Sequence, residues 1–419
     1  MNVVNPFKEK GIKIEKTYEN WKKLAAKPYN PKTTSPFTKV RIILLNGAEF
    51  EANWYSHQFH RHCNNNDLRR EIALIRRREQ QQQKKIAALK PIEETVLQHT
   101  MGYEQLAVEL TAILAQHVKD KYVKKALDFA LLEDFDHVYR FGNLLEMDEG
   151  IKAETLLGCY TEVMPGRPTI AEHRYPADEI KKFINSESAD LFTKLTVNII
   201  TAAEQQTMNF YMNQANFYKN ELGRKLFSEI AMIEEQHVSQ YGSLLDTNCS
   251  WLEGLLMHEY VECYLYYSCY EDESDEYIKE IWRNFYYEEC GHLQKVAELL
   301  KKYEGKNWID VFPCGGDFPE LLKFGENKEY IRKVLKQTGC HTADLEDYAK
   351  ISDMPENANY FKYNTTVNKP ISEVASHEVI EKHIKKYGED YRFEESQNPI
   401  PTLRDRTQDN VDFARTLKK

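Results

Sequence analysis

The chain has 419 residues, of which 42% are hydrophobic and 29% charged, values that are ordinary for a globular protein with a sizeable core. Lysine and arginine total 56 against 66 aspartates and glutamates, and this net charge of −10 argues against a nucleic-acid or anionic-membrane binder. No apolar run approaches the roughly 20 residues that span a bilayer, no signal peptide is visible, and the eight cysteines form no CxxC pair. We therefore expect a cytoplasmic protein with no membrane segment and no bound nucleic acid.

Residues 1–90 are predicted to form an N-terminal arm that ends in one amphipathic helix. Residues 1–65 contain four prolines and a strand-like run at 40–45, so we expect them to be irregular. Residues 67–89 carry an apolar stripe at helical spacing, and Pro91 ends this helix. His57 and His60 would share a face if their segment were helical, which would allow a metal or proton-relay role, although a surface or packing role is the simpler interpretation.

Residues 91–305 are predicted to form an all-α core of three helical hairpins. The periodicity indicates six long helices, at 92–118, 121–146, 188–219, 222–246, 251–270 and 275–303. The long connection at 147–187 contains prolines and glycine that forbid a continuous helix. Residues 306–419 are expected to be an irregular C-terminal extension with short helices near 326–338 and 372–387, which either wraps the core or serves as an arm in a homo-oligomer.

A motif that recurs at a fixed offset marks the chemistry of this core. HVYRFGNLLE begins at His137 and HVSQYGSLLD begins at His237, and five of their ten positions are identical. In each copy an acidic residue precedes the histidine by three positions, and another acidic residue precedes that one by 30. The third hairpin repeats the pattern with Glu259, Glu289 and His292. A spacing of 30 residues brings the two acids to one level of an antiparallel helix pair.

Each acid of the motif also lies on the apolar stripe of its helix, as Glu104 does between Met101 and Val108. Several carboxylates buried together cannot all stay ionised without cations. Carboxylate and imidazole ligands suit iron or manganese. The pattern therefore predicts a metal site, whereas buried polar pairs that only fix the helix register are the alternative.

One acid from each of two helices, with an acidic-x-x-His motif from each of two others, resembles the ferritin-like superfamily, on its rubrerythrin-like, di-iron carboxylate side. The resemblance covers residues 92–303 and implies a four-helix bundle whose two hairpins are joined by a crossover along its length. The connection at 147–187 fits that role, so the first and second hairpins are paired. The predicted ligands of two iron or manganese ions are Glu104, Asp134, His137, Glu204, Glu234 and His237.

The third hairpin departs from the family plan. Its acidic and imidazole side chains could build a second metal site, complete one across a dimer, or form hydrogen bonds only; they are Glu259, Glu262, Glu289 and His292. Tyr103, beside Glu104, and Tyr241, one turn after His237, could support the metal site, although tyrosines at helical spacing are more often core residues.

The resemblance implies redox chemistry with dioxygen or peroxide, either detoxification or oxygenation of an organic substrate. Because no flavin, nicotinamide or rubredoxin motif is present, electrons would come from a separate donor or from the substrate. The alternatives are an iron-oxidising, iron-handling protein and a helical interaction protein without catalytic activity. Neither the choice between iron and manganese nor the number of metal centres follows from the residues.

Overall fold

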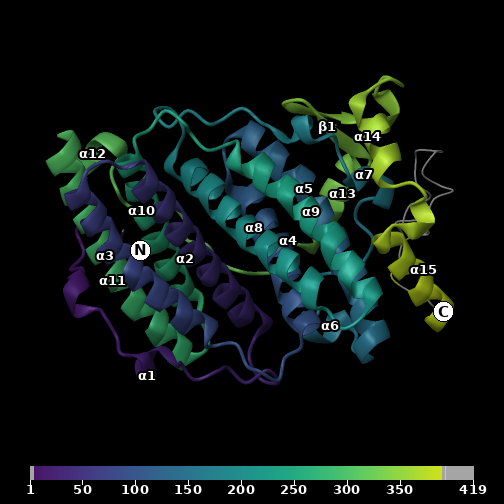
Figure 1. Ribbon diagram of the computed structural model, residues 1–419, viewed down its shortest axis with the longest axis horizontal. Coiled ribbons are helices and arrows are strands. Elements are labelled where there is room, and N and C mark those ends of the chain that lie inside the picture. The colour runs from purple at the N-terminus through teal and green to yellow at the C-terminus, as the bar shows by residue number, and fades with distance from the viewer. Residues whose placement is uncertain (1–3, 389–391, 393–419) are drawn as a thin grey trace. The chain divides into compact units, whose positions relative to one another are not determined.

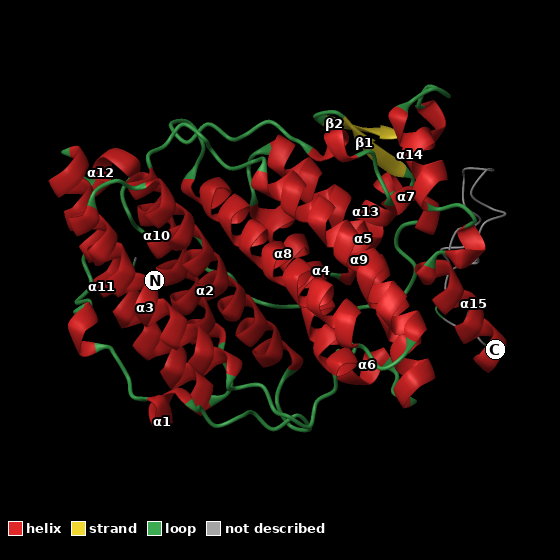
Figure 2. Cartoon of the chain, viewed as in Figure 1, coloured by secondary structure: helices red, strands yellow, loops and turns green. Residues whose placement is uncertain are grey.

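The computed structural model describes residues 4–388 and residue 392, and the description below is limited to them. The protein is all-α: among these residues, strands occur only in one antiparallel pair, β1 (His341–Asp344) and β2 (Asp347–Lys350), in which His341 is opposite Lys350 (Figure 2). The six predicted core helices and the helix at 67–89 are confirmed within a few residues at each end. So are the two short helices of the C-terminal extension.

The chain folds into two units, each of which combines segments distant in the sequence. The first unit contains residues 4–94, 184–206 and 246–324, and the second contains residues 95–183, 207–245 and 325–388. Helix α8 (Leu191–Phe217) passes from the first unit to the second between Gln206 and Thr207. The predicted segment 1–90 therefore lies in the first unit, whereas the predicted segment 91–305 and residues 306–388 are each divided between the two units.

Four long helices build the first unit: α2 (Pro36–His62), α3 (Asn66–Ala87), α10 (Trp251–Asp272) and α11 (Glu276–Glu304). Helix α2 contacts α3 and α10, and α11 contacts α10 and α3, so the four enclose a common interior (Figure 1). Side-chain caps fix where three of these helices begin: Asn65 caps α3, Ser250 forms a capping box on α10, and Asp275 caps α11. The short helices α1 (Trp21–Leu24) and α12 (Trp308–Val311) complete this unit.

The second unit is built on α4 (Val96–His117), α5 (Lys121–Glu149), α9 (Glu221–Gly242) and the end of α8. Helix α5 contacts both α4 and α9, and the Tyr211 ring of α8 packs on Phe141 of α5 and Phe227 of α9. Gly150 adopts φ +70°, a conformation that glycine reaches without strain, and ends α5. The remaining helices of this unit are α6 (Ala153–Leu156), α7 (Thr169–Glu172), α13 (Lys328–Thr338), α14 (Asn359–Val367) and α15 (Ala375–Tyr387).

The prediction that residues 1–65 are irregular is wrong for residues 36–62, which form α2. Pro36 occupies the first turn of this helix, where its missing N–H costs no hydrogen bond. The strand-like run at 40–45 is buried all around, and periodicity alone does not separate a buried strand from a buried helix.

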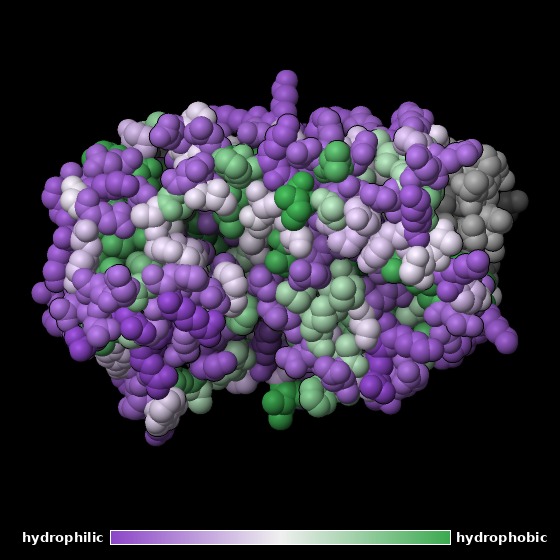
Figure 3. Space-filling model, turned by 45° about the horizontal axis from the view of Figure 1, so that its top comes forward, coloured by the Kyte–Doolittle hydropathy of each residue, from purple (hydrophilic) through white to green (hydrophobic). Residues whose placement is uncertain are grey.

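Polar side chains dominate the face of the molecule drawn in Figure 3, and its hydrophobic residues are scattered among them. In the part of the chain that the structure describes, no helix combines the length and the apolar character needed to cross a membrane. The end of the predicted C-terminal extension, residues 389–391 and 393–419, lies outside the described residues.

Candidate metal centre

The structure brings five of the six predicted ligands together inside the second unit. They come from three helices, all are buried with 0% exposure, and they are Glu104 of α4, Asp134 and His137 of α5, and Glu234 and His237 of α9. The Glu234 carboxylate lies between the two imidazoles, with Oε1 3.1 Å from His137 Nδ1 and Oε2 3.1 Å from His237 Nδ1. His237 Nδ1 is also 3.2 Å from Asp134 Oδ1.

Both histidines direct the same ring nitrogen, Nδ1, into this carboxylate cluster. One potential ligand atom each from Asp134, Glu234 and His237 lies within 4.8 Å of the others, and the same holds for Glu104, His137 and Glu234. Two neighbouring positions that share Glu234 could therefore each hold a cation. The shared carboxylate and the two inward imidazoles fit the donor set of a two-metal centre.

The carboxylates of the cluster are poorly neutralised by hydrogen bonds. Burial raises the pKa of Glu104 well above its ordinary value; His137 acts in the opposite direction, and repulsion from Glu234 adds to the rise. Glu104 Oε1 accepts a 2.5 Å hydrogen bond from Tyr211, but no described residue donates to Glu104 Oε2 or to Asp134 Oδ2. Bound cations would supply the missing positive charge.

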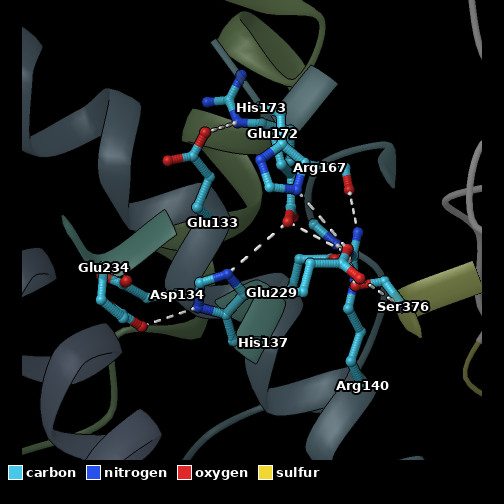
Figure 4. A network of polar contacts seen from close by, with 12 residues as sticks. Glu133, Asp134, His137, Arg140, Arg167, Glu172, His173, Glu229, Glu234 and Ser376 are labelled. Carbon is cyan, nitrogen blue, oxygen red and sulfur yellow. Dashed lines mark hydrogen bonds and ion pairs between the residues drawn. The ribbon is translucent and has the colours of Figure 1, made fainter. Parts of the chain in front are cut away.

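An acidic side chain outside the cluster faces the outer ring nitrogen of each histidine. The Nε2 atom of His237 is 2.7 Å from Glu133 Oε2. The Nε2 atom of His137 is 3.8 Å from Glu172 Oε2 (Figure 4). A carboxylate on the outer nitrogen favours the tautomer in which Nε2 carries the proton and Nδ1 has a free lone pair for a metal.

Arginines in turn hold these outer carboxylates. Arg174 donates to Glu133, and Arg140 Nη1 is 3.1 Å from Glu172 Oε2. Burial opposes ionisation of Glu133, but Arg174, the hydrogen bond with His237 and Arg167 together lower its pKa to about 2. Glu133 is therefore a charged partner of His237 and lies outside the predicted ligand set.

The sequence interpretation missed this arginine layer. Arg167 and Arg174 lie in the connection at 147–187, whose prolines and glycine predicted only that it forms no continuous helix. Both guanidinium groups are buried, and Arg174 also binds Glu179, with Nη2 3.1 Å from Oε2. The sequence did contain one indication of this layer: each of the two proline-containing stretches of the connection also contains an arginine, and the connection joins helices that carry the acidic motif.

The remaining predicted residues of this site are buried too. Glu204 is 1% exposed and lies on α8, seven residues before Tyr211, in the part of the helix assigned to the first unit; its role as a ligand stays a prediction. Tyr103 stacks on Phe210 with ring centroids 4.3 Å apart and is a packing residue beside Tyr211. The Tyr241 ring is 6.3 Å from that of His237.

The third hairpin and the two N-terminal histidines have different outcomes. The buried side chains of the third hairpin gather inside the first unit, where one ligand atom each from Glu259, Glu262 and Glu289 lies within 4.8 Å of the others.

His57 and His60 lie near the end of α2: His57 is exposed, and His60 Nε2 is 3.0 Å from Arg69 Nη2. The structure gives these two histidines no shared acidic partners in any described residue, which favours the surface interpretation.

In comparisons with known proteins, no family model, no curated protein and no solved structure matches the chain.

Proposed function

We propose that the second unit is a di-iron or di-manganese carboxylate oxidoreductase that acts with dioxygen or peroxide. The observation that carries this proposal is the pair of imidazoles on either side of Glu234, each with Nδ1 directed inward and surrounded by buried carboxylates. Bound iron or manganese would supply one-electron redox steps and open coordination positions for the oxidant. A cytoplasmic location and an external electron donor, or an oxidisable organic substrate, belong to the same proposal.

The residues of the chain would hold this chemistry in a dry interior. Glu104, Asp134 and Glu234 contribute negative charge that stabilises the higher oxidation state of a bound ion. The paired outer carboxylates and arginines keep both histidines aligned while that charge changes.

Tyr211 is a proton-bearing side chain beside the carboxylate cluster. Its hydroxyl donates to Glu104 Oε1 at 2.5 Å and is fully buried. Burial and the neighbouring carboxylates Glu104 and Glu234 raise the pKa of Tyr211 well above its ordinary value. The phenol therefore keeps its proton at neutral pH and holds one oxygen of Glu104 in place.

The test begins with protein loaded with Fe²⁺ without oxygen and then exposed separately to hydrogen peroxide and to dioxygen, while the optical spectrum is followed. Rapid peroxide turnover supports detoxification, and an oxygen-dependent absorption that decays only with an added organic compound supports oxygenation. The His137→Ala/His237→Ala variant should lose either response, and Glu235→Gln, on the same helix as His237, should keep it. A chain that oxidises no iron, or one that slowly takes up many irons, contradicts the proposal.

A further inference from the structure

A second buried acidic cluster lies inside the first unit. Each of its four long helices contributes one glutamate that is at most 1% exposed: Glu49 from α2, Glu79 from α3, Glu259 from α10 and Glu289 from α11 (Figure 1). One ligand atom each from Glu79, Glu259 and His292 lies within 4.8 Å of the others. The third hairpin therefore faces the N-terminal hairpin α2–α3.

The α2–α3 hairpin carries a fourth, altered copy of the repeated motif. Glu79 follows Glu49 by 30 residues, as Glu289 follows Glu259, and Gln82 stands three residues later where the other copies have histidine. Helix α3 is also rich in arginine and glutamine, which disguises its inward face. Because glutamine replaces histidine in this copy, the copy does not match the acidic-x-x-His pattern.

The contacts of this cluster repeat those of the second unit with one change. His292 Nδ1 points inward, 3.0 Å from Glu289 Oε2 and 3.8 Å from Glu259 Oε2. Gln82 Nε2 donates to Glu289 Oε1 at 2.5 Å, on the side opposite to His292. The Tyr266 hydroxyl donates to Glu49, as that of Tyr211 does to Glu104, and each tyrosine lies seven residues after an acid of the motif, Glu259 or Glu204.

Several polar atoms in this interior accept no hydrogen bond from any described residue. They include both carboxylate oxygens of Glu262 and the amide oxygen of Gln82. Both side chains are at most 2% exposed. Orphaned oxygens of this kind call for a bound cation or for protons.

The hydrogen-bonded ion pair of the neighbouring Arg78 lies outside the cluster. Arg78 Nε is 2.8 Å from Glu288 Oε2, and this ion pair engages a carboxylate outside the motif. One carboxylate oxygen of Glu79 and one of Glu259 lie within 4.8 Å of each other, and a cation or a shared proton would stabilise this proximity of two buried carboxylates. The five carboxylates face inward with a single imidazole, that of His292.

We propose that the first unit holds a second, separate metal centre, formed by Glu49, Glu79, Gln82, Glu259, Glu262, Glu289 and His292, that favours hard cations such as Mn²⁺ or iron. Hard oxygen ligands outnumber imidazole more strongly here than in the second unit, and ligand type decides selectivity between such ions. The third hairpin thus finds its partner in the same chain. This inference does not depend on the redox activity proposed for the second unit.

Mn²⁺ binding tests the proposal, because free Mn²⁺ gives a six-line electron paramagnetic resonance signal that is lost on binding. The full chain is titrated with Mn²⁺ alone as wild type, as the second-unit variant His137→Ala/His237→Ala, and as the first-unit variant Glu79→Gln/Glu262→Gln. Glutamine preserves side-chain volume and removes charge. The control Glu71→Gln/Glu276→Gln removes two carboxylates from α3 and α11 outside the cluster.

We expect two classes of sites in the wild type and the control. The second-unit variant should keep the sites of the first unit. In the first-unit variant, the affinity of those sites should fall at least about tenfold, while the sites of the second unit are kept. The proposal is overturned if the first-unit variant binds as the wild type does, or if the second-unit variant loses all binding. If the protein binds Mn²⁺ only at the sites of the first unit, the metal centre proposed for the first unit is supported and the function proposed for the second unit is contradicted.

A gain-of-ligand variant tests the same centre without removing a carboxylate. Gln82→His, made in the His137→Ala/His237→Ala background, adds an imidazole and should raise the affinity for Co²⁺ relative to Mn²⁺ by about tenfold. It should also change the visible absorption of bound Co²⁺. An unchanged Co²⁺ to Mn²⁺ preference and an unchanged spectrum would contradict the proposal.

Discussion

Glu133 lies outside the proposed ligand set but faces one of its histidines. Its carboxylate faces His237 Nε2 at 2.7 Å and is held by Arg174. In Glu133→Gln, an amide replaces this anion, so the tautomer with a free Nδ1 loses its support. We expect metal affinity in the second unit to fall about 10- to 100-fold, measured by competition with a chelator of known affinity. Glu235→Gln is the control; equal affinities for the two variants would remove Glu133 from the account.

Glu109 gives a pH-dependent stability that is independent of the proposed ligands. Burial raises its pKa to about 7, although Thr161 and Asn327 donate hydrogen bonds to it. The unfolded chain ionises this group near its ordinary pKa of about 4.5, so its contribution to stability is complete below about pH 4.5 and is lost as the pH rises to about 7.

Glu109→Gln should therefore match the wild type near pH 4.5 and exceed its free energy of unfolding by about 1–3 kcal/mol at pH 8. Glutamine retains an oxygen that can accept from Thr161. Chemical denaturation of both proteins at the two pH values measures this difference, in which the other titrating groups cancel. A difference that does not change with pH would show that Glu109 is ionised in the folded protein.

At the scale of elements, residues 325–388 of the C-terminal extension are a structural part of the second unit. Helix α15 contacts α5 and α9, Ile380 is fully buried, and His383 Nε2 lies 2.9 Å from Glu146 Oε2. Ile380→Ala should lower the free energy of unfolding by about 2–4 kcal/mol, because it leaves a cavity in that contact. The exposed Lys385→Ala should change it by less than about 0.5 kcal/mol. Similar values for both variants would mean that α15 does not dock on this unit.

The elements also show which features could be read from the sequence. The repeated acidic-x-x-His motif and helical periodicity predicted α4, α5, α9, α10 and α11, because those signals are local. The pairing of the first hairpin with the second, which brings His137 and His237 to either side of Glu234, was expected only from the family resemblance. Helix α2 was missed because its buried run lacks amphipathic periodicity, and the role of Gln82 was missed because glutamine is a weaker metal signal than histidine. The arginine layer depends on how the 147–187 connection folds back, which no local pattern states.

On the scale of the whole molecule, bound metal should stabilise the fold. Both units bury carboxylates whose repulsion metal would relieve, and a ligand present at 100 times its dissociation constant stabilises by about 2.7 kcal/mol. Removal of metal with a chelator should therefore lower the melting temperature at neutral pH, and Mn²⁺ or Fe²⁺ should restore it. The same melting temperature with and without metal would indicate that the clusters are structural polar networks.

The most direct test of the central claim is the position of bound metal in the second unit. Crystals of the protein loaded with Fe²⁺ under anaerobic conditions should show anomalous scattering at the iron edge in two peaks near Glu234. One peak should lie against His137 and Glu104, and the other against His237 and Asp134. Iron-loaded crystals that show no anomalous peak among these five side chains would contradict the account.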